Sequence, residues 1–323
     1  MSHNISLKQQ DHRIIIENEY LTLITHPKSA RIEKLYVVDK KGKKENVVLS
    51  YDDEVHWIAD EFCFGATVGP VAGRIASGEY RNYQLEKNDG KNTLHSGSFG
   101  YHKQKFLLEK MDCTDYYAFV TYKADTSIYL GLPQVKTMVT CYVNNNQLSI
   151  IFHGQPLETT IWNPTNHTYF NLSGKGQNIH SHILQLNARG QLELNEEKIP
   201  TGEVLPLNPI FKKSSFAEIL NHYPNGLDDC FLLNKDLSVP SLILFEEESG
   251  RKLEITTNRE AVVLFTGTGM TSNHLVNGVP LLSEQGLAIE CQEVPDAHHN
   301  LLSNIEYSKE ESLYKWTNYQ FSI

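Results

Sequence analysis

The chain has 323 residues, a formal net charge of −10 and 40 % hydrophobic residues, a fraction sufficient for a large buried core. The acidic balance disfavours nucleic acid and anionic membranes, because both attract basic surfaces. The first residues lack an apolar run of signal-peptide length, and no run approaches the roughly 18 apolar residues that span a bilayer. The five cysteines are far apart and contain no C-x-x-C pair, which predicts reduced, mostly buried thiols in a cytoplasmic protein.

Apolar residues recur with a period of two along most of the chain, as in half-buried strands. The clearest case is residues 135–143, which Asn144-Asn145-Asn146 separates from a second apolar run at 148–152, as in a hairpin. The turn at 248–250 separates a similar pair at 242–246 and 253–257. In chain order, the other expected strands are residues 12–25, 31–38, 46–49, 80–86, 105–111, 116–122, 183–187, 261–266, 286–294 and 314–323.

Only the segment from Ser214 to Asn221 has a helical pattern, with Ser214 or Ser215 as its N-cap. So many strands, with turn signals every 8–12 residues or so, predict an all-β fold with few short helices, built as a large antiparallel β-sandwich or barrel. No linker, repeat or low-complexity segment divides the sequence, so we expect one domain over residues 1–323.

Polar residues gather in five segments within this strand pattern. The first, residues 65–76, is rich in glycine and places Arg74 between small residues. Arg74 could donate a fork of hydrogen bonds to ligand oxygens, or it could be a surface arginine in a tight turn. The second segment, residues 92–100, contains His95, which could be either a turn histidine or a site residue.

The third segment, residues 163–174, reads N-P-T-N-H-T-Y-F-N-L-S-G and sets His167 beside Asn166. The fourth, residues 225–231, carries the adjacent Asp228 and Asp229 before a strand, where turn or cap chemistry is an alternative. The fifth, residues 287–297, places Glu290 inside an apolar run. Glutamate is seldom fully buried without a partner. A histidine and a carboxylate in otherwise buried strands are the minimal parts of an acid–base catalyst.

A competing signal is His180-Ser181-His182, because H-x-H on a strand would point both imidazoles to one side, as a metal site requires. The glutamate that would complete a cupin-like motif is absent, since Gln185 and Leu186 occupy that region. The sequence also lacks the H-E-x-x-H, Walker and G-x-S-x-G motifs of zinc proteases, nucleotide-binding loops and serine hydrolases.

Taken in order, the five segments resemble the aldose 1-epimerases, or galactose mutarotases, over nearly the whole chain. The resemblance implies a large β-sandwich that binds an aldose in an open cleft, with no metal and no organic cofactor, and it leaves a homodimer open. It implies that His167 is the general acid and Glu290 the general base. The implied supporting residues are His95 at the ring oxygen, and Arg74, Asp228, Gln292 and Asn166 as substrate-binding groups.

Three positions depart from the common family pattern: Gly73 stands where many members have asparagine, Ser96 where glycine is usual, and Asp229 where histidine is usual. These differences bear on the sugar preferred, among glucose, galactose and maltose. The reaction itself needs a protonated His167, which we expect nearby carboxylates to favour. The alternatives are an epimerase of hexose phosphates or disaccharides in the same superfamily, and a non-catalytic carbohydrate-binding sandwich.

Overall fold

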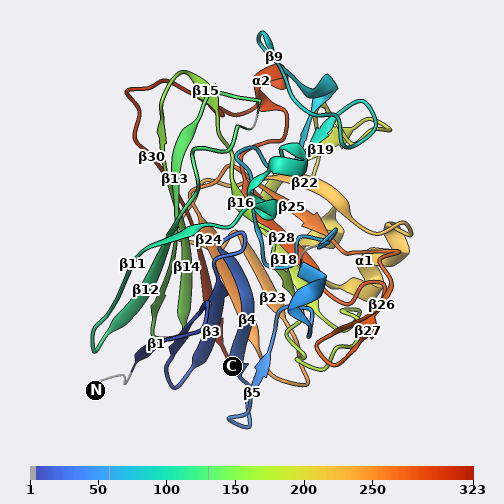
Figure 1. Ribbon diagram of the computed structural model, residues 1–323. Helices are drawn as coiled ribbons and strands as arrows, with labels where there is room; N and C mark the ends of the chain where they lie inside the picture. Colours follow the sequence, from blue (N-terminus) through green and yellow to red (C-terminus); the bar gives the residue numbers. More distant parts are fainter. Residues whose placement is uncertain (1–4, 58, 130) are drawn as a thin grey trace.

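The computed structural model describes residues 5–57, 59–129 and 131–323 and contains three large sheets, in which every strand pairing is antiparallel (Figure 1). The largest has nine strands in the order β11-β12-β13-β14-β30-β24-β23-β18-β21. Their bounds are β11 Leu107–Cys113, β12 Tyr117–Lys123, β13 Val135–Asn144, β14 Gln147–Pro156, β30 Leu313–Ser322, β24 Lys252–Thr257, β23 Leu242–Phe245, β18 Ile183–Leu186 and β21 Ser214–Ser215.

The other two large sheets have five and six strands. The five-stranded sheet is an N-terminal meander of β1 Ser6–Gln10, β2 Arg13–Glu17, β3 Leu21–His26, β4 Arg31–Val38 and β5 Lys44–Asn46. The six-stranded sheet has the order β17-β28-β25-β22-β19-β20, with bounds β17 Tyr169–Phe170, β28 Leu287–Gln292, β25 Ala261–Phe265, β22 Asp228–Leu233, β19 Ala188–Leu194 and β20 Pro200–Leu205.

Short pairs of strands connect the sheets. They are β7 Arg74–Ile75 with β10 Thr93–Leu94, β6 Thr67–Val68 with β16 Thr165–Asn166, β8 Glu79–Tyr80 with β9 Tyr83–Gln84, β15 Thr160–Ile161 with β29 Glu306–Tyr307, and β26 Ser272–Val276 with β27 Val279–Leu281. The described ranges contain two α-helices, α1 Phe216–His222 and α2 Ala297–Asn300. Their 3₁₀ turns are η1 Glu54–Trp57, η2 Ala76–Gly78, η3 Gly97–Phe99, η4 Tyr101–Lys103 and η5 Pro209–Lys212. Among the described residues, no helix has the length and apolar character needed to cross a bilayer.

One large hydrophobic cluster lies between the sheets. It includes Ile16 and Leu23 from the N-terminal sheet, Val120 and Val139 from the nine-stranded sheet, and Ile289 from the six-stranded sheet. The inward residues of β13 alternate with more exposed ones, as the period of two predicted. The all-β sandwich expected from the sequence is therefore confirmed.

Several expected elements differ in their bounds. The strand expected at 12–25 is the hairpin of β2 and β3, and the one expected at 80–86 is the two-residue pair β8 and β9. The expected helix begins at Phe216, because Ser215 is its N-cap and forms a capping box with Glu218. The sequence did not predict β19 and β20, whose polar residues obscure the alternation. The strand expected after Asp228 and Asp229 is β22, which begins at Asp228 itself.

Candidate active site

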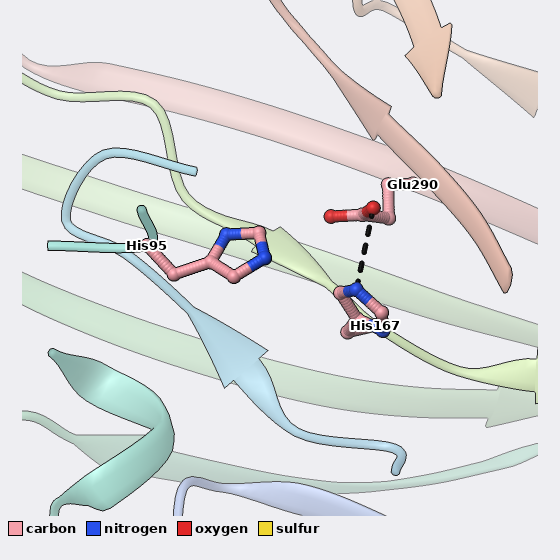
Figure 2. Close-up of side chains that lie close together, drawn as sticks. All are labelled: His95, His167 and Glu290. Carbon is pink, nitrogen blue, oxygen red and sulfur yellow. Dashed lines mark ion pairs between the residues drawn. The ribbon is translucent and has the colours of Figure 1, made fainter. Parts of the chain in front are cut away.

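A cleft of about 260 Å³ opens at one face of the six-stranded sheet. Six of the seven residues expected to form the site line it: Arg74, His95, His167, Asp228, Glu290 and Gln292. They come from all five polar segments, which are far apart in the sequence and which the fold brings together. Figure 2 shows that the side chains of His95, His167 and Glu290 converge, and its dashed line marks the contact between the last two.

Glu290 is placed by the alternation of β28. All six residues of this strand are buried. Ile289 and Cys291 point into the large core, so Glu290 and Gln292 point to the opposite face, into the cleft. Glu290 is only 4 % exposed, and within the described chain its Oε2 has no hydrogen-bond partner. A buried carboxylate oxygen left free in this way is available to a ligand.

His167 lies between β16 and β17 and is held by its backbone. Its N–H donates to the carbonyl of Ala66 at 2.8 Å, and its carbonyl accepts from the N–H of Gly65 at 3.1 Å. Gly65 has φ +65°, and a Cβ there would lie 1.9 Å from the carbonyl oxygen of Ile32, so only glycine fits. The Nε2 atom of His167 then lies 3.4 Å from Oε1 of Glu290.

His95 is held as a neutral hydrogen-bond donor. Its Nδ1 accepts from the N–H of Gly73 at 3.2 Å, which places the ring proton on Nε2. Burial, with added repulsion from His167, His102 and Arg74, lowers the pKa of His95 well below its usual range. The rings of His95 and His167 meet edge to face, with centroids 5.5 Å apart. His95 can therefore donate a hydrogen bond to a ligand oxygen without itself being charged.

Arg74 and Asp228 face each other across the polar part of the cleft. The Nη1 atom of Arg74 is 3.8 Å from Oδ2 of Asp228, and its Nε donates to Oδ2 of Asp89 at 2.7 Å. Asp89 fixes the guanidinium and leaves its other nitrogens available to hydroxyl oxygens. Asp89 was not predicted as a site residue, because an aspartate before Gly90 is explained by a turn alone.

Asn166, which the resemblance implied as a substrate-binding residue, does not line the cleft. Its Nδ2 donates to the carbonyl of Gly65 at 2.9 Å, and its Oδ1 accepts from the hydroxyl of Thr168. The amide therefore fastens the His167 segment to the glycine segment. Gln292, in contrast, has a buried Oε1 with no partner in the part of the chain that the structure describes.

Burial sets the protonation of Glu290 and His167. It raises the pKa of Glu290 to about 8; Asp228 acts in the same direction and Arg74 in the opposite one. Burial also lowers the pKa of His167 to about 4. The expectation that nearby carboxylates would keep His167 protonated is therefore wrong, because desolvation dominates and a protonated Glu290 carries no charge that could attract a proton to His167. Near neutral pH the pair shares one proton, which resides on Glu290 in the free protein.

The ligand atoms of His95, His167 and Glu290 lie within 4.8 Å of one another, as in a metal site. The surroundings do not suit a metal. A metal-binding histidine normally donates its second N–H to an acceptor, but Nδ1 of His95 instead accepts from Gly73. The absence of a metal requirement stays a prediction, and the unusual proximity of these groups is better explained by proton transfer.

The H-x-H signal has a structural explanation. His180 and His182 precede β18 and do not lie on a strand. Nε2 of His182 accepts from the N–H of Leu172 at 2.8 Å, whereas Nε2 of His180 pairs with Glu284 at 2.6 Å. The two imidazoles therefore serve separate contacts.

A buried ion pair between Arg259 and Glu293 helps to tie the His167 segment to the end of β28. Arg259 donates to the carbonyl of Pro164 at 2.9 Å and to Oδ1 of Asn163, and its Nη2 lies 2.5 Å from Oε2 of Glu293. That last contact is an ion pair by distance, although its angles are not those of a hydrogen bond. The side-chain amide of Asn163 donates to the carbonyl of Glu293 at 3.0 Å. The segment before His167 is thereby fixed to the end of β28, which carries Glu290.

Sequence reasoning also missed the apolar wall of the cleft, which includes Phe62, Val263, Phe265 and Met270. Val263 is the cross-strand partner of Glu290, so strand register could have identified it. Two charged residues of the cleft, Glu61 and Lys198, were also missed, because they come from loops and carry no motif.

Comparison with known proteins identifies the family. The family model described as aldose 1-epimerase matches residues 12–320. The chain belongs to the aldose 1-epimerase family. An aldose 1-epimerase of Streptococcus thermophilus is 32 % identical over 313 residues, covering 92 % of this chain and 90 % of the relative. The galactose mutarotase of Mus musculus is 32 % identical over 279 residues, covering 82 % and 80 %.

Solved structures of the family share the fold. The galactose 1-epimerase of Lactobacillus acidophilus has a TM-score of 0.83 at 26 % identity, covering 99 % of both chains. An aldose epimerase homologue from C. elegans has a TM-score of 0.85 at 25 % identity, covering 94 % of this chain and 96 % of that one. The protein is thus an isomerase with the mutarotase activity of its family, and its substrate is an aldose.

Proposed function

We propose that this aldose 1-epimerase interconverts the α and β anomers of a free aldohexose, galactose or glucose, with Glu290 and His167 as its proton-transfer pair. The observation that carries the proposal is the 3.4 Å contact between these two buried groups inside the cleft. The mouse relative and the Lactobacillus structure are both named for galactose, which supports a hexose of that kind.

The reaction needs one proton removed from the C1 hydroxyl and one delivered to the ring oxygen. Glu290 removes the first and His167 delivers the second; the ring opens, the C1–C2 bond rotates, and closure from the other face gives the other anomer. In the free protein the shared proton resides on Glu290, so it passes to His167 across their contact before the forward step. The reverse direction uses the opposite assignment, and each group contributes roughly 10²–10⁴-fold to the rate.

The remaining groups bind and orient the sugar. His95 donates its Nε2–H to the ring oxygen region, and Arg74, Asp228 and Gln292 bind hydroxyls. The apolar wall at Phe62 and Phe265 suits the apolar face of a pyranose ring. Acidic lining residues outnumber the cations Arg74 and Lys198, which disfavours a hexose phosphate. We also propose a cytoplasmic protein of one domain, either alone or as a homodimer.

Polarimetry of freshly dissolved α-galactose and α-glucose tests the function, because the approach to equilibrium must accelerate in proportion to enzyme. We expect a bell-shaped profile of kcat/KM against pH. The rate falls as pH drops through about 4, where His167 takes up a second proton, and as pH rises through about 8, where Glu290 loses the shared one. If Glu290 were ionised and His167 protonated in the resting protein, the acidic limb would instead report Glu290 and the alkaline limb His167.

A carboxylate of the same cleft provides the control. Asp229→Asn removes a charge near Asp228 but leaves the catalytic pair in place, so it should retain both limbs and most of the rate. No acceleration by the wild-type protein with any aldohexose would contradict the proposed substrate. An Asp229→Asn protein as slow as Glu290→Gln would contradict the proposed pair.

A further inference from the structure

A second hollow, of about 330 Å³, lies at the N-terminal sheet and shares no lining residue with the catalytic cleft. The side chains that matter for its chemistry are His12, His26, Lys28, Glu54, Trp57 and Lys105. The rings of His26 and Trp57 meet at 69° with centroids 5.0 Å apart. The hollow therefore combines an aromatic wall with several nitrogen donors.

His26 presents an unused donor to this hollow. Its Nδ1 accepts from the N–H of Lys28 at 3.0 Å, so the ring proton is on Nε2. Among the described residues, Nε2 has no hydrogen-bond partner, and the residue is only 6 % exposed. A buried donor left unpaired costs about 1–3 kcal/mol. A bound acceptor would remove that cost.

Glu54 does not accept a hydrogen bond from Nε2 of His26. Its Oε1 lies 3.5 Å from Nε2 of His26 without hydrogen-bond geometry, while its Oε2 accepts from Nη2 of Arg13 at 3.0 Å. The side chain of Glu54 is half exposed and held on the Arg13 side. The donor of His26 thus remains available beside a carboxylate that is already paired.

Positive charge is concentrated around the hollow, although the whole chain has a net charge of −10. Lys28 and Lys105 are paired in a β-bridge at its edge. Arg31 and Arg13 lie over the Trp57 ring, with guanidinium carbons 5.0 and 5.7 Å from its centroid. Both are paired with carboxylates, Arg31 with Asp60 and Arg13 with Glu33 and Glu54, so the charge offered to a ligand is that of Lys28 and Lys105. Burial, with repulsion from Arg31 and Lys103, lowers the pKa of Lys28. An anion entering here would relieve that repulsion.

We propose that this hollow is a second ligand site, which binds the oxyanion of a small molecule, a carboxylate or a phosphoryl group. The oxyanion accepts the Nε2–H of His26 and faces the ammonium group of Lys105, while the rest of the ligand packs against Trp57. Burial lowers the pKa of His26 to about 4, so at neutral pH this side chain supplies a hydrogen bond and the lysines supply the charge.

The test is a titration of the full-length protein with inorganic phosphate, and in a second arm with acetate, followed by tryptophan fluorescence. We expect a saturable change that disappears in Trp57→Phe, since Trp162 and Trp316 lie outside the hollow. His26→Phe keeps a ring against Trp57 but removes the donor, and Lys105→Ala removes the charge. Each should weaken binding about 10-fold or more, the worth of a hydrogen bond to a charged group.

Lys136→Ala is the matched control, because it also removes one positive charge but lies on β13, outside the hollow. It should bind phosphate like the wild type, and mutarotation should be unchanged in all these variants. Tighter binding of phosphate identifies a phosphoryl ligand, and tighter binding of acetate a carboxylate.

The proposal is overturned if neither anion saturates the signal, or if Lys136→Ala loses as much affinity as Lys105→Ala. Circular dichroism verifies that each variant is folded. Should His26→Phe fail to fold, the ring ¹⁵N signals of the wild-type protein decide instead. Phosphate or acetate must then shift those of His26 and leave those of His153 in place.

Discussion

Two buried glutamates near the end of β28 have opposite surroundings. Glu290 is 4 % exposed, its Oε2 has no partner among the described residues, and its nearest ionisable contact is His167 at 3.4 Å. Glu293 is 2 % exposed and lies between Arg259 at 2.5 Å and Lys315 at 2.9 Å. Burial is the same in both cases, and only the compensation differs.

The cations around a buried carboxylate distinguish a glutamate that holds the fold together from one that can take part in a reaction. Glu293 is neutralised by two cations, so its charge can fasten the strand carrying Glu290 to the segment carrying His167. No cation among the described residues contacts Glu290, and burial raises its pKa to about 8. A group that costs stability in this way is expected at a functional site, where consistency with the fold is given up for chemistry.

The largest effect is expected from removing the uncompensated glutamate. Glu290→Gln keeps the shape of the side chain and removes the proton acceptor, so mutarotation should slow by at least about 10²-fold. His167→Asn should do the same. The double variant should be little slower than the poorer single one, because groups that act as a unit are not additive. Near-normal polarimetric rates in a folded Glu290→Gln protein would reject the mechanism.

Breaking the ion pair of Arg259 and Glu293 should lower stability more than activity. Arg259→Met leaves the charge of Glu293 without its buried partner, which costs about 3–5 kcal/mol in comparable cases. The denaturation midpoint should fall accordingly. In the protein that remains folded, kcat should fall by a larger factor than KM rises. Exchanging the surface residue Lys136 for methionine serves as the control. Unchanged stability of Arg259→Met would mean that this ion pair does not hold the two segments together.

A smaller loss is expected for the hydroxyl-binding arginine. Arg74→Ala removes charge-assisted hydrogen bonds worth about 1.5–3 kcal/mol, so kcat/KM should fall by about 10- to 100-fold. Both limbs of the pH profile should remain, because arginine does not exchange a proton in this range. Disappearance of either limb would move Arg74 into the proton-transfer machinery.

The smallest effect is a gain in stability from the catalytic defect itself. The folded-state pKa of Glu290 is raised, so its favourable contribution is complete below about 4.5 and is lost as pH rises through about 8. Glu290→Gln should therefore be more stable than the wild type at pH 9, and the difference should be smaller at pH 5. Urea titrations at both pH values measure this. A difference that does not grow with pH would show that Glu290 is not held in its neutral form.

The sequence determined the all-β class through its period of two, and it singled out Arg74, His95, His167, Asp228, Glu290 and Gln292 as site residues. Both results rest on local signals: alternation along a strand, and polar residues placed where apolar ones would be expected. The motifs also indicated the aldose 1-epimerase family, which the family-model match over residues 12–320 confirms.

The contacts that position the site residues, and their protonation, depend on tertiary structure. No local pattern shows that the amide of Asn166 is used by Gly65, that Asp89 fixes Arg74, or that Arg259 joins the two catalytic segments. The protonation of the pair was also beyond the sequence. Attraction between opposite charges can be anticipated from neighbouring motifs, but desolvation depends on how completely distant strands enclose His167 and Glu290, and that enclosure exists only in the folded protein.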